Sequence, residues 1–247
     1  MSPTLNWQIA AVAGIRPETA NVKTFTLSLP EWVEHRAGQH YDVRLTAEDG
    51  YQAQRSYSVA SEPERRGEID LTVERVPEGE VSGYMHEVLA PGDLIEVRGP
   101  IGGYLVWDAS MQEPLLLVAG GAGIVPLMAI LRHRAAAGSS VPTRLLYSAR
   151  SLEDVIYRAE LERLAARQPG LEVLLALTRM HPPGWTGYSR RIDQAMLAEV
   201  AGPLGTSLRA YVCGPTPFVE AAANYLVQVG VPQAQVRTER FGPTGGS

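Results

Sequence analysis

The run Arg55-Ser56-Tyr57-Ser58 carries side chains that could bind a flat, phosphorylated cofactor. It lies in alternating apolar and polar sequence, which is typical of an extended strand. Alternate side chains of a strand share a face, so Arg55 and Tyr57 should point together while Ser56 and Ser58 point the other way. Arg55 could then pair bidentately with a pyrophosphate, and Tyr57 could stack on a fused-ring cofactor. The alternative is an ordinary half-exposed strand without a ligand.

A second candidate follows at Gly79-Glu80-Val81-Ser82, where a glycine turn precedes a predicted helix over Ser82–Leu89. Ser82 is expected to be the N-cap of that helix. The start of a helix offers free amides and the positive end of its dipole to a phosphate. A simple helix cap is the alternative, and Ser82 could serve both purposes.

The glycine-rich run from Gly120 to Pro126 separates a buried apolar strand from a helical stretch. Glycines there permit positive φ and a close approach of the backbone to a ligand, and Pro126 suits an early position in a helix. The spacing differs from the GxGxxG pattern of many dinucleotide-binding turns. A purely structural glycine turn is the alternative.

Cys213-Gly214-Pro215 ends a later predicted strand, at the carboxyl edge where open α/β sheets bind ligands. This position favours a site-lining role for Cys213, although a lone cysteine is most often a small buried hydrophobe. Cys213 is the only cysteine, so the chain can form no intramolecular disulfide and cannot supply four thiolates to an iron–sulfur cluster. Nothing in the sequence indicates a covalent nucleophile.

Several arginines lie at or after predicted strand ends in the C-terminal half of the chain. If they converge on one edge of a sheet, they would suit a phosphate monoester, whereas scattered arginines are usually solvated. The 5 histidines have no metal-ligand spacing, so no metal site is expected. The arginines are Arg150, Arg158, Arg179, Arg190 and Arg191.

Two kinds of secondary structure should position these candidates. From Trp7 to Val106, short alternating runs separated by turn formers predict a closed antiparallel β-barrel. From Leu115–Ala119 onward, strands alternate with helices, which indicates a parallel α/β sheet. We therefore predict two domains, residues 1–112 and 113–247. Beyond the first strand, the second domain should have strands at Thr143–Ala149, Leu171–Leu177 and Arg209–Cys213 and helices at Pro126–Ala137, Val155–Ala166, Asp193–Val200 and Pro217–Val229.

Length and composition limit the number of domains and the classes of protein to which the chain could belong. A chain of 247 residues suits two domains, and its hydrophobic fraction of 45% is ordinary for a globular protein. The formal charge of -5 argues against a general nucleic-acid binder. The N-terminal residues show no secretory signal, and no apolar run is long enough to span a bilayer, so a cytoplasmic protein is expected. Only the glycine-rich tail at 242–247 suggests disorder.

Taken together, the motifs resemble those of the ferredoxin–NADP reductase superfamily, in the same order and over roughly Trp7 to Gly242. Arg55-Ser56-Tyr57-Ser58 matches the RxYS flavin motif, and Gly79-Glu80-Val81-Ser82 resembles the GxxS phosphate motif. The segment from Gly121 to Pro126 resembles the GxGIxP nucleotide turn, and Cys213-Gly214-Pro215 matches the CGP motif. The resemblance implies a flavin-binding barrel followed by a nucleotide-binding α/β domain.

By this resemblance, Arg55 would bind the flavin pyrophosphate, Tyr57 would pack on the isoalloxazine and Ser58 would lie near the flavin N5. Ser82 would cap the pyrophosphate. FAD is the implied flavin, although some relatives use FMN. The residues implied on the flavin side are Arg55, Ser56, Tyr57, Ser58, Val73, Arg75, Gly79, Val81 and Ser82.

On the nucleotide side, the resemblance places Cys213 beside the nicotinamide, so that Ser58 and Cys213 would shape the hydride-transfer site. Ala122 stands where many relatives carry threonine, and Phe241 is a candidate substitute for the terminal tyrosine of plant-type relatives. The arginines resemble a cluster that grips the 2′-phosphate, which favours NADPH over NADH. The implied residues are Gly121, Ala122, Gly123, Pro126, Ser148, Arg150, Arg158, Arg179, Arg191, Cys213, Gly214, Pro215 and Phe241.

The implied activity is hydride transfer from NADPH or NADH to FAD, followed by electron transfer to a separate acceptor such as a ferredoxin, flavodoxin, haem protein or other redox enzyme. Oxygenase reductases of the superfamily often carry a fused iron–sulfur domain, which the single cysteine excludes within this chain. Two alternatives stay open. One is a reductase of free flavin or another small molecule, and the other is a non-catalytic regulatory subunit that binds flavin or nucleotide.

Overall fold

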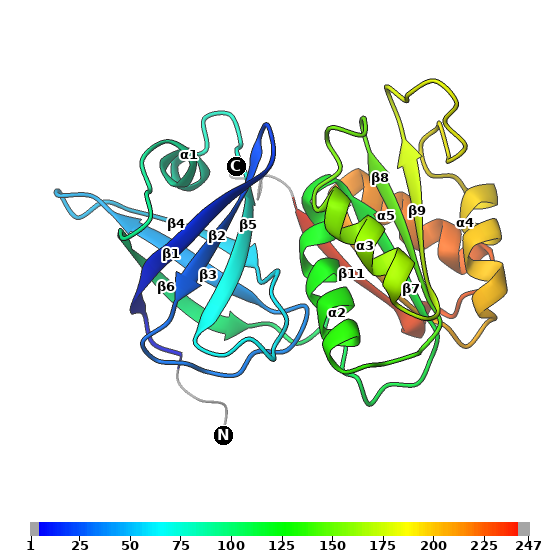
Figure 1. Ribbon diagram of the computed structural model, residues 1–247, viewed down its shortest axis with the longest axis horizontal. Helices are drawn as coiled ribbons and strands as arrows, with labels where there is room; N and C mark the ends of the chain where they lie inside the picture. Colours follow the sequence, from blue (N-terminus) through cyan, green and yellow to red (C-terminus); the bar gives the residue numbers. More distant parts are fainter. Residues whose placement is uncertain (1–4, 242–247) are drawn as a thin grey trace. The chain divides into compact units, whose positions relative to one another are not determined.

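The computed structural model describes residues 5–241, which form two compact units, each with its own sheet (Figure 1). The first unit runs through Asp108 and also includes Met128–Ala136. The second comprises Ala109–Leu127 and continues from Ala137. The division at 112/113 expected from the sequence stays a prediction. Within residues 5–241, no helix is long and apolar enough to cross a membrane.

The sheet of the first unit has 6 strands, and every pairing in it is antiparallel. Its spatial order is β4-β3-β6-β1-β2-β5. A bridge between Val59 and Leu71 joins the end of β4 to β5, so the two outer strands of this order meet. The predicted antiparallel barrel is therefore confirmed. The strands are β1 (Gln8–Thr19), β2 (Val22–Ser28), β3 (His40–Thr46), β4 (Gln52–Ser58), β5 (Glu68–Glu74) and β6 (Leu94–Ile101).

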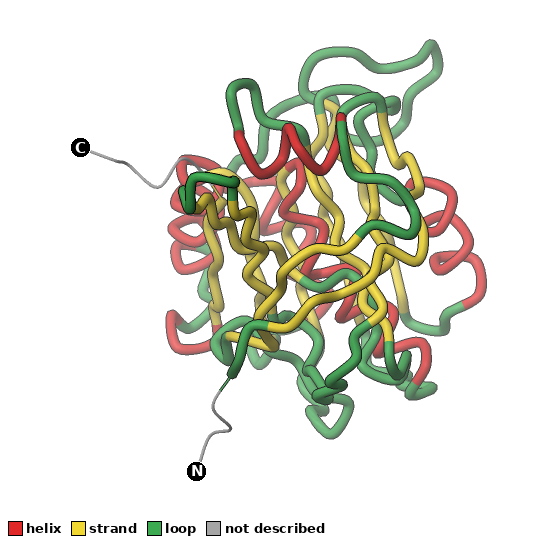
Figure 2. The backbone as a smooth tube through the Cα atoms, turned by 90° about the vertical axis from the view of Figure 1, so that its left-hand side faces the viewer, coloured by secondary structure: helices red, strands yellow, loops and turns green. Residues whose placement is uncertain are grey.

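The barrel is filled by alternate side chains of its strands. Phe25 and Leu27 of β2 and Leu71 of β5 are fully buried in this core, as the period-two pattern requires. Helix α1 (Glu80–Glu87) lies at one end of the barrel (Figure 2) and adds Val81 and Met85 to the same core. These two residues are four apart, so they share one face of the helix. The opposite face of α1 is left outside the core.

Helix α1 begins at Glu80 with Gly79 as its N-cap, so the expected N-cap role of Ser82 is wrong. The Ser82 hydroxyl accepts a hydrogen bond from the Val76 amide (3.2 Å) and donates one to the Gly79 carbonyl (3.4 Å). Ser82 therefore holds the turn that precedes the helix. The sequence pattern placed the helix in the right segment, but it did not show which residue is the N-cap.

The second unit has a sheet of 5 parallel strands in the order β11-β10-β7-β8-β9, which confirms the predicted α/β domain. Every residue of the central strand β7 is buried. The ranges of β8 and β9 are those predicted, whereas β11 was not predicted. The strands are β7 (Leu115–Gly120), β8 (Thr143–Ala149), β9 (Leu171–Leu177), β10 (Arg209–Pro215) and β11 (Val236–Phe241).

Helices α3 (Arg158–Arg167), α4 (Gln194–Ala201) and α5 (Thr216–Gln228) flank this sheet, with α3 on one face and α4 and α5 on the other (Figure 1). The fourth helix, α2 (Ile124–Ala136), follows the glycine turn. Helix α3 begins at Arg158 and not at Val155, because Tyr157 has a left-handed φ of 60° that a helix cannot include. The positions of the other helices agree with the prediction to within two residues.

Candidate functional site

In the first unit, the register of β3 against β4 determines where the Arg55 motif points. Arg55 lies opposite Val43 and Tyr57 lies opposite Tyr41, whereas Ser56 lies opposite Asp42. Because directly paired residues share a face of a sheet, Arg55 and Tyr57 lie on the side of the barrel core and Ser56 lies on the other side. The expected alternation is confirmed.

The exposed Arg55 guanidinium is available to an anion. Its Nη1 donates to the Gln54 carbonyl (2.6 Å), and among the described residues no carboxylate pairs with it. Tyr57 is half-buried against the core. Burial raises the pKa of Tyr57 to about 12, although the charge of Arg55 opposes this shift, so the phenol stays neutral near neutral pH. A cation beside a neutral aromatic ring fits a flavin pyrophosphate and its ring system.

Ser56 takes part in a hydrogen-bond network on the barrel's outer face. Its hydroxyl donates to Asp42 Oδ1 (2.6 Å), and Arg98 Nη2 donates to Asp42 Oδ2 (2.8 Å). Burial alone would raise the pKa of Asp42, but the hydrogen bonds from Ser56 and Arg98 and the charge of Arg98 hold it below the ordinary value. The Ser56 hydroxyl is thus engaged within the barrel wall, and its role toward a cofactor stays a prediction.

Ser58 is buried and lies directly opposite His40, on the same face as Ser56. Burial holds the pKa of His40 below its ordinary value, although the charge of the nearby Asp42 carboxylate opposes this shift. Neither His40 nor Asp42 was singled out from the sequence. Only the strand register could have identified them, since both lie one strand away from the Arg55 motif.

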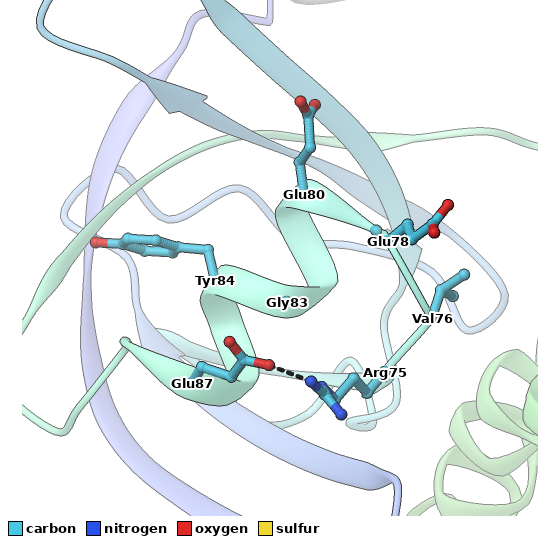
Figure 3. Close-up of a pocket in the computed structure, with 8 residues that line it drawn as sticks. Arg75, Val76, Glu78, Glu80, Gly83, Tyr84 and Glu87 are labelled. Atoms are coloured by element: carbon cyan, nitrogen blue, oxygen red, sulfur yellow. Dashed lines mark hydrogen bonds and ion pairs between the residues drawn. The ribbon is translucent and has the colours of Figure 1, made fainter.

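Val73 and Arg75, at the end of β5, already have partners. Val73 is fully buried in the barrel core, and its carbonyl accepts a hydrogen bond from His86 Nε2 (2.9 Å). Arg75 forms an ion pair with Glu87 of α1 (Figure 3). A ligand could reach Val73 only through its backbone and would have to share Arg75 with Glu87. Their roles in flavin binding stay predictions.

A side chain at position 79, in the turn before α1, would be crowded by its neighbours. A Cβ on Gly79 would lie 2.5 Å from the Ser82 hydroxyl and 3.1 Å from the Val76 carbonyl oxygen. Directly after this turn, the first amides of α1 have no acceptor inside the helix, as at any helix start. These amides could receive a phosphate, although the side chains of Val81 and Ser82 are themselves buried.

A cavity of about 300 Å³ lies along the outer side of α1. Figure 3 shows the Arg75–Glu87 pair at one end and Glu78 and Glu80 at the other. Three carboxylates and one guanidinium line this cavity, together with Gly79 and Glu80 at the start of α1. A phosphate held by the first amides of α1 would therefore have to lie away from the carboxylates of Glu78 and Glu80.

In the second unit, the glycine turn comprises a short 3₁₀ helix, η1 (Gly121–Gly123), between β7 and α2. A Cβ on Gly123 would lie 2.1 Å from the Cys213 carbonyl oxygen and 2.6 Å from the Gly214 nitrogen. The turn is therefore packed against the end of β10, and the two motifs form one site edge. Around the ideal Cβ position of Gly121, by contrast, no atom beyond its neighbours lies within 4 Å, so this side of the turn is open to a ligand.

Ala122 lies in the same turn, and Pro126 lies in the first turn of α2, two residues after the helix begins. The amides at this helix start can receive a diphosphate, which agrees with the fit expected for a dinucleotide. Pro126 does not disturb the helix, because an amide in the first turn needs no intrahelical acceptor.

Cys213 is fully buried and pairs with Ala119 of β7 on one side and Glu239 of β11 on the other. Burial, together with the charge of Glu239, raises the pKa of the Cys213 thiol well above its usual value. The thiol is therefore neutral near neutral pH, which argues against a thiolate nucleophile. Pro215 pairs with the half-buried Phe241 at the end of β11, and the glycine-rich tail at 242–247 lies outside the described residues.

Two of the predicted arginines come together. Beyond the ends of β8 and β9 the pairing continues: the Thr178 amide donates to the Ala149 carbonyl (3.0 Å) and the Arg179 amide donates to the Arg150 carbonyl (2.9 Å). Arg150 and Arg179 are thus neighbours, and both are exposed. Ser148, which is half-buried, lies at the end of β8 opposite Gly120.

The remaining arginines lie elsewhere. Arg158 pairs with Glu162 within α3 (3.0 Å), and Arg190 pairs with Asp193 (2.6 Å). Arg191 is exposed in the segment that leads into α4. The structure therefore brings the backbones of Arg150 and Arg179 together, whereas Arg158 and Arg190 already have acidic partners.

Two family models match this chain in succession. Residues 11–105 match the oxidoreductase FAD-binding domain, and residues 117–224 match the oxidoreductase NAD-binding domain. The chain therefore contains an oxidoreductase FAD-binding domain followed by an oxidoreductase NAD-binding domain. The resemblance to the ferredoxin–NADP reductase superfamily is thereby confirmed, and so are the predicted flavin and nicotinamide cofactor classes.

Individual relatives of this oxidoreductase agree. It is 32% identical over 231 residues to the glycine betaine monooxygenase reductase subunit of Chromohalobacter salexigens, which covers 92% of this chain and 62% of that protein. It is 30% identical to the reductase component of phenol 2-monooxygenase from Pseudomonas sp. strain CF600, over 94% of this chain and 64% of that protein. The chain thus spans less than two thirds of the length of these curated relatives.

The fold is also found in a solved structure of comparable extent. The cytochrome b5 reductase domain of Ulva prolifera nitrate reductase superposes with a TM-score of 0.82 at 25% identity, covering 95% of this chain and 97% of that one. The barrel and the parallel sheet of this chain therefore form a fold that is known from a reductase domain.

Proposed function

We propose that this oxidoreductase takes a hydride from NADPH onto FAD and passes the electrons to a separate redox protein. The observation that carries the proposal is the presence in one chain of an FAD-binding barrel with an exposed Arg55 and an NAD-binding unit with an open glycine turn. Its relatives bear the names of reductase subunits and components of monooxygenases, which supports a separate acceptor.

A bound FAD would supply the hydride acceptor and the capacity to release two electrons singly. The chain itself supplies binding and orientation. Arg55 would neutralise the diphosphate, with the first amides of α1 completing its hydrogen bonds. Tyr57 would hold the ring system through its flat, neutral face, and Ser58 lies one residue further along the same strand.

On the nucleotide side, the amides at the start of α2 would hold the dinucleotide diphosphate, and Gly121 leaves that approach open. Cys213 would border the nicotinamide as a neutral thiol, and Arg150 and Arg179 would bind the 2′-phosphate. We expect NADPH to be preferred over NADH because only NADPH has the 2′-phosphate that Arg150 and Arg179 would bind. Gly214 and Pro215 follow Cys213 on β10, Phe241 pairs with Pro215 from β11, and these residues would complete that wall.

The first test is an anaerobic titration of the flavin-loaded protein with NADPH and, separately, with NADH, followed by the loss of oxidised-flavin absorbance. Rapid bleaching by NADPH is the expected result. Bleaching by NADH alone would support reductase activity but contradict the binding of a 2′-phosphate by Arg150 and Arg179. A bound flavin that neither nucleotide bleaches would replace the proposal with a regulatory binding module.

A second measurement separates a protein acceptor from a small one. Turnover with a protein partner should change with ionic strength, whereas turnover with free flavin or ferricyanide should change much less. A reductase that transfers electrons only to free flavin would show no saturable protein acceptor at any salt concentration. The cytoplasmic location stays a prediction.

A further inference from the structure

We propose that Phe218 is a positioning residue for the nicotinamide and that it acts through the backbone of two glycines. Its ring occupies the space where side chains of Gly120 and Gly214 would lie. The role rests on the proposed function, since it concerns the same hydride transfer. Phe218 was not singled out from the sequence, because nothing in the local pattern connects it to a glycine almost a hundred residues earlier.

The order of the strands indicates where the second unit binds its ligand. Strand β7 lies between β8, the next strand in the chain, and β10, which comes much later. In an open α/β sheet, ligands bind outside the carboxyl ends of the strands at the point where the strand order reverses. That point lies between the ends of β7 and β10. Gly120 and Gly214 therefore border the expected ligand crevice.

Position 120 excludes a side chain because of Phe218. The backbone of Gly120 is extended, with φ -123° and ψ 118°, which any residue can adopt. A Cβ on Gly120 would nevertheless lie 2.9 Å from the Phe218 ring, and the three atoms nearest to it all belong to that ring. The glycine is thus required by a side chain of α5 and not by the conformation of its own strand.

Gly214 meets the same ring from the neighbouring strand. Its φ of 154° favours glycine. A Cβ there would lie 3.0 Å from the Phe218 ring and 3.0 Å from the Gly120 carbonyl oxygen. The Gly214 backbone is therefore held between the end of β7 and the ring. Because Gly214 directly follows Cys213, the ring also determines where the wall that contains Cys213 lies.

Helix α5 holds the ring in place. Phe218 is the third residue of α5 and follows Pro217 in its first turn. One turn later Ala222 is fully buried against the sheet, so this end of the helix is anchored by packing. A side chain on an anchored helix is positioned more precisely than one on a loop. The ring is therefore a fixed support for the two glycines.

The consequence for the reaction follows from what each contact holds. In the proposed function, Arg150, Arg179 and the start of α2 bind phosphates, whereas Cys213 borders the nicotinamide. Without the Phe218 ring, the Cys213 wall would be free to shift into the vacated space. The phosphates would still be bound, but the nicotinamide would lose its alignment. A misplacement of about 1 Å can lower the rate of a chemical step about a hundredfold.

The test uses the flavin-loaded full chain with Phe218→Ala and with Phe218→Leu, which refills most of the space. After anaerobic rapid mixing with saturating NADPH, the flavin of Phe218→Ala should be reduced at least about tenfold more slowly than that of the wild type. Kd for NADP⁺ should hardly change, and Phe218→Leu should recover most of the rate. Reoxidation of dithionite-reduced flavin by ferricyanide bypasses the nucleotide and should stay at the wild-type rate.

Leu226→Ala is the matched control for lost packing. Leu226 lies further along α5 and is fully buried. Its truncation should lower the midpoint of thermal unfolding but leave flavin reduction near the wild-type rate. Gly120→Ala tests the contact itself. It should lower the unfolding midpoint by several degrees in the wild-type background and much less in Phe218→Ala, because the ring is what the new methyl group meets.

A wild-type rate of flavin reduction in Phe218→Ala, or an equal loss of rate in Leu226→Ala, would overturn the proposal. Equal destabilisation by Gly120→Ala in both backgrounds would also contradict it. If neither NADPH nor NADH reduces the wild-type flavin, the proposed function fails by itself. Alkylation of Cys213 by iodoacetamide then tests Phe218: saturating NADP⁺ should protect the wild type and protect Phe218→Ala much less, whereas equal protection would exclude the positioning role.

Discussion

Ser56 donates a hydrogen bond of 2.6 Å to Asp42, the residue directly opposite it across β3 and β4. Arg98 on β6 binds the other oxygen of the same carboxylate at 2.8 Å. Asp42 thus ties three neighbouring strands together on the outer face of the barrel. Because successive side chains alternate, fixing Ser56 outward also fixes Arg55 and Tyr57 on the other side.

Asp42→Asn should lower the free energy of unfolding by about 1–3 kcal/mol at neutral pH, because it replaces charge-assisted hydrogen bonds with weaker ones. The pKa of Asp42 lies below its ordinary value in the folded protein, since hydrogen bonds from Ser56 and Arg98 outweigh burial. Its stabilisation is therefore complete above the unfolded value of about 4 and is lost as the pH falls through the folded-state value.

Urea unfolding of wild type and Asp42→Asn across this acid range checks the prediction, and the difference between them should shrink at the lowest pH. A difference that stays constant with pH would mean that the charge of Asp42 contributes nothing. Ser56→Ala, which removes one of the two donors, should show a smaller effect of the same sign.

Arg55→Ala should weaken flavin binding roughly tenfold to a hundredfold, the loss expected for hydrogen bonds to a charged group. Thermal unfolding of the flavin-free protein should hardly change, because the side chain is exposed and bonds only to the Gln54 carbonyl. Fluorescence titration with FAD measures the affinity. Arg66→Ala removes another exposed arginine of the same unit, and an equal loss in that variant would contradict a specific role for Arg55.

Arg150→Ala and Arg179→Ala should each raise KM for NADPH roughly tenfold while leaving KM for NADH nearly unchanged, because only NADPH carries the 2′-phosphate. Steady-state kinetics with both nucleotides gives the ratio of the two KM values directly. Arg167→Ala, at the exposed end of α3, is the matched control and should not alter it. If the ratio of the KM values for NADPH and NADH is unchanged in both variants, Arg150 and Arg179 do not bind the 2′-phosphate.

Gly123→Ala should destabilise the second unit by about 3 kcal/mol, the upper end of the usual cost of overpacking, because the new Cβ would meet backbone that cannot rotate away. That Cβ would lie 2.1 Å from the Cys213 carbonyl oxygen. Gly202→Ala is the control, since Gly202 has helical backbone angles and no atom within 4 Å of a Cβ there. Thermal unfolding of the two variants should differ clearly in midpoint, and similar midpoints would show that the turn can move.

Cys213 should resist alkylation in the native protein. Burial, with the charge of Glu239, raises the pKa of its thiol, and the thiolate is the reactive form. Labelling by iodoacetamide at pH 8 should be at least about a hundredfold slower in the native protein than in urea. Equal rates would mean that the end of β10 opens freely or that the thiol is not buried in solution.

Patterns that extend over several residues were readable from the sequence alone. The strands β8 and β9 have their predicted bounds, because the short apolar runs at 145–147 and 173–177 lie between turn formers and leave few other places for a strand. The alternation of the Arg55 motif was also predictable, since the period of a strand is two. These features depend on local chemistry, which any stretch of sequence carries with it.

The backbone conformations of single residues could not be predicted from the sequence. Tyr157 adopts a left-handed φ that delays α3, and Gly79 replaces Ser82 as the N-cap of α1. Strand β11 was missed because its half-exposed residues at the edge of the sheet are mostly polar. In each case the tertiary environment chose among conformations that differ little in local energy.

The amino-acid sequence by itself determined the two cofactor domains, their order and the motifs that carry them. The tertiary structure alone decided which side chains within each unit meet: Arg150 with Arg179, Gly123 with the end of β10, and Ser56 with Asp42. The physical reason is that a motif records the chemistry of consecutive residues. Strand register and the packing of turns bring together residues that are distant in the chain, and a shift of one residue would reverse every side chain of a strand.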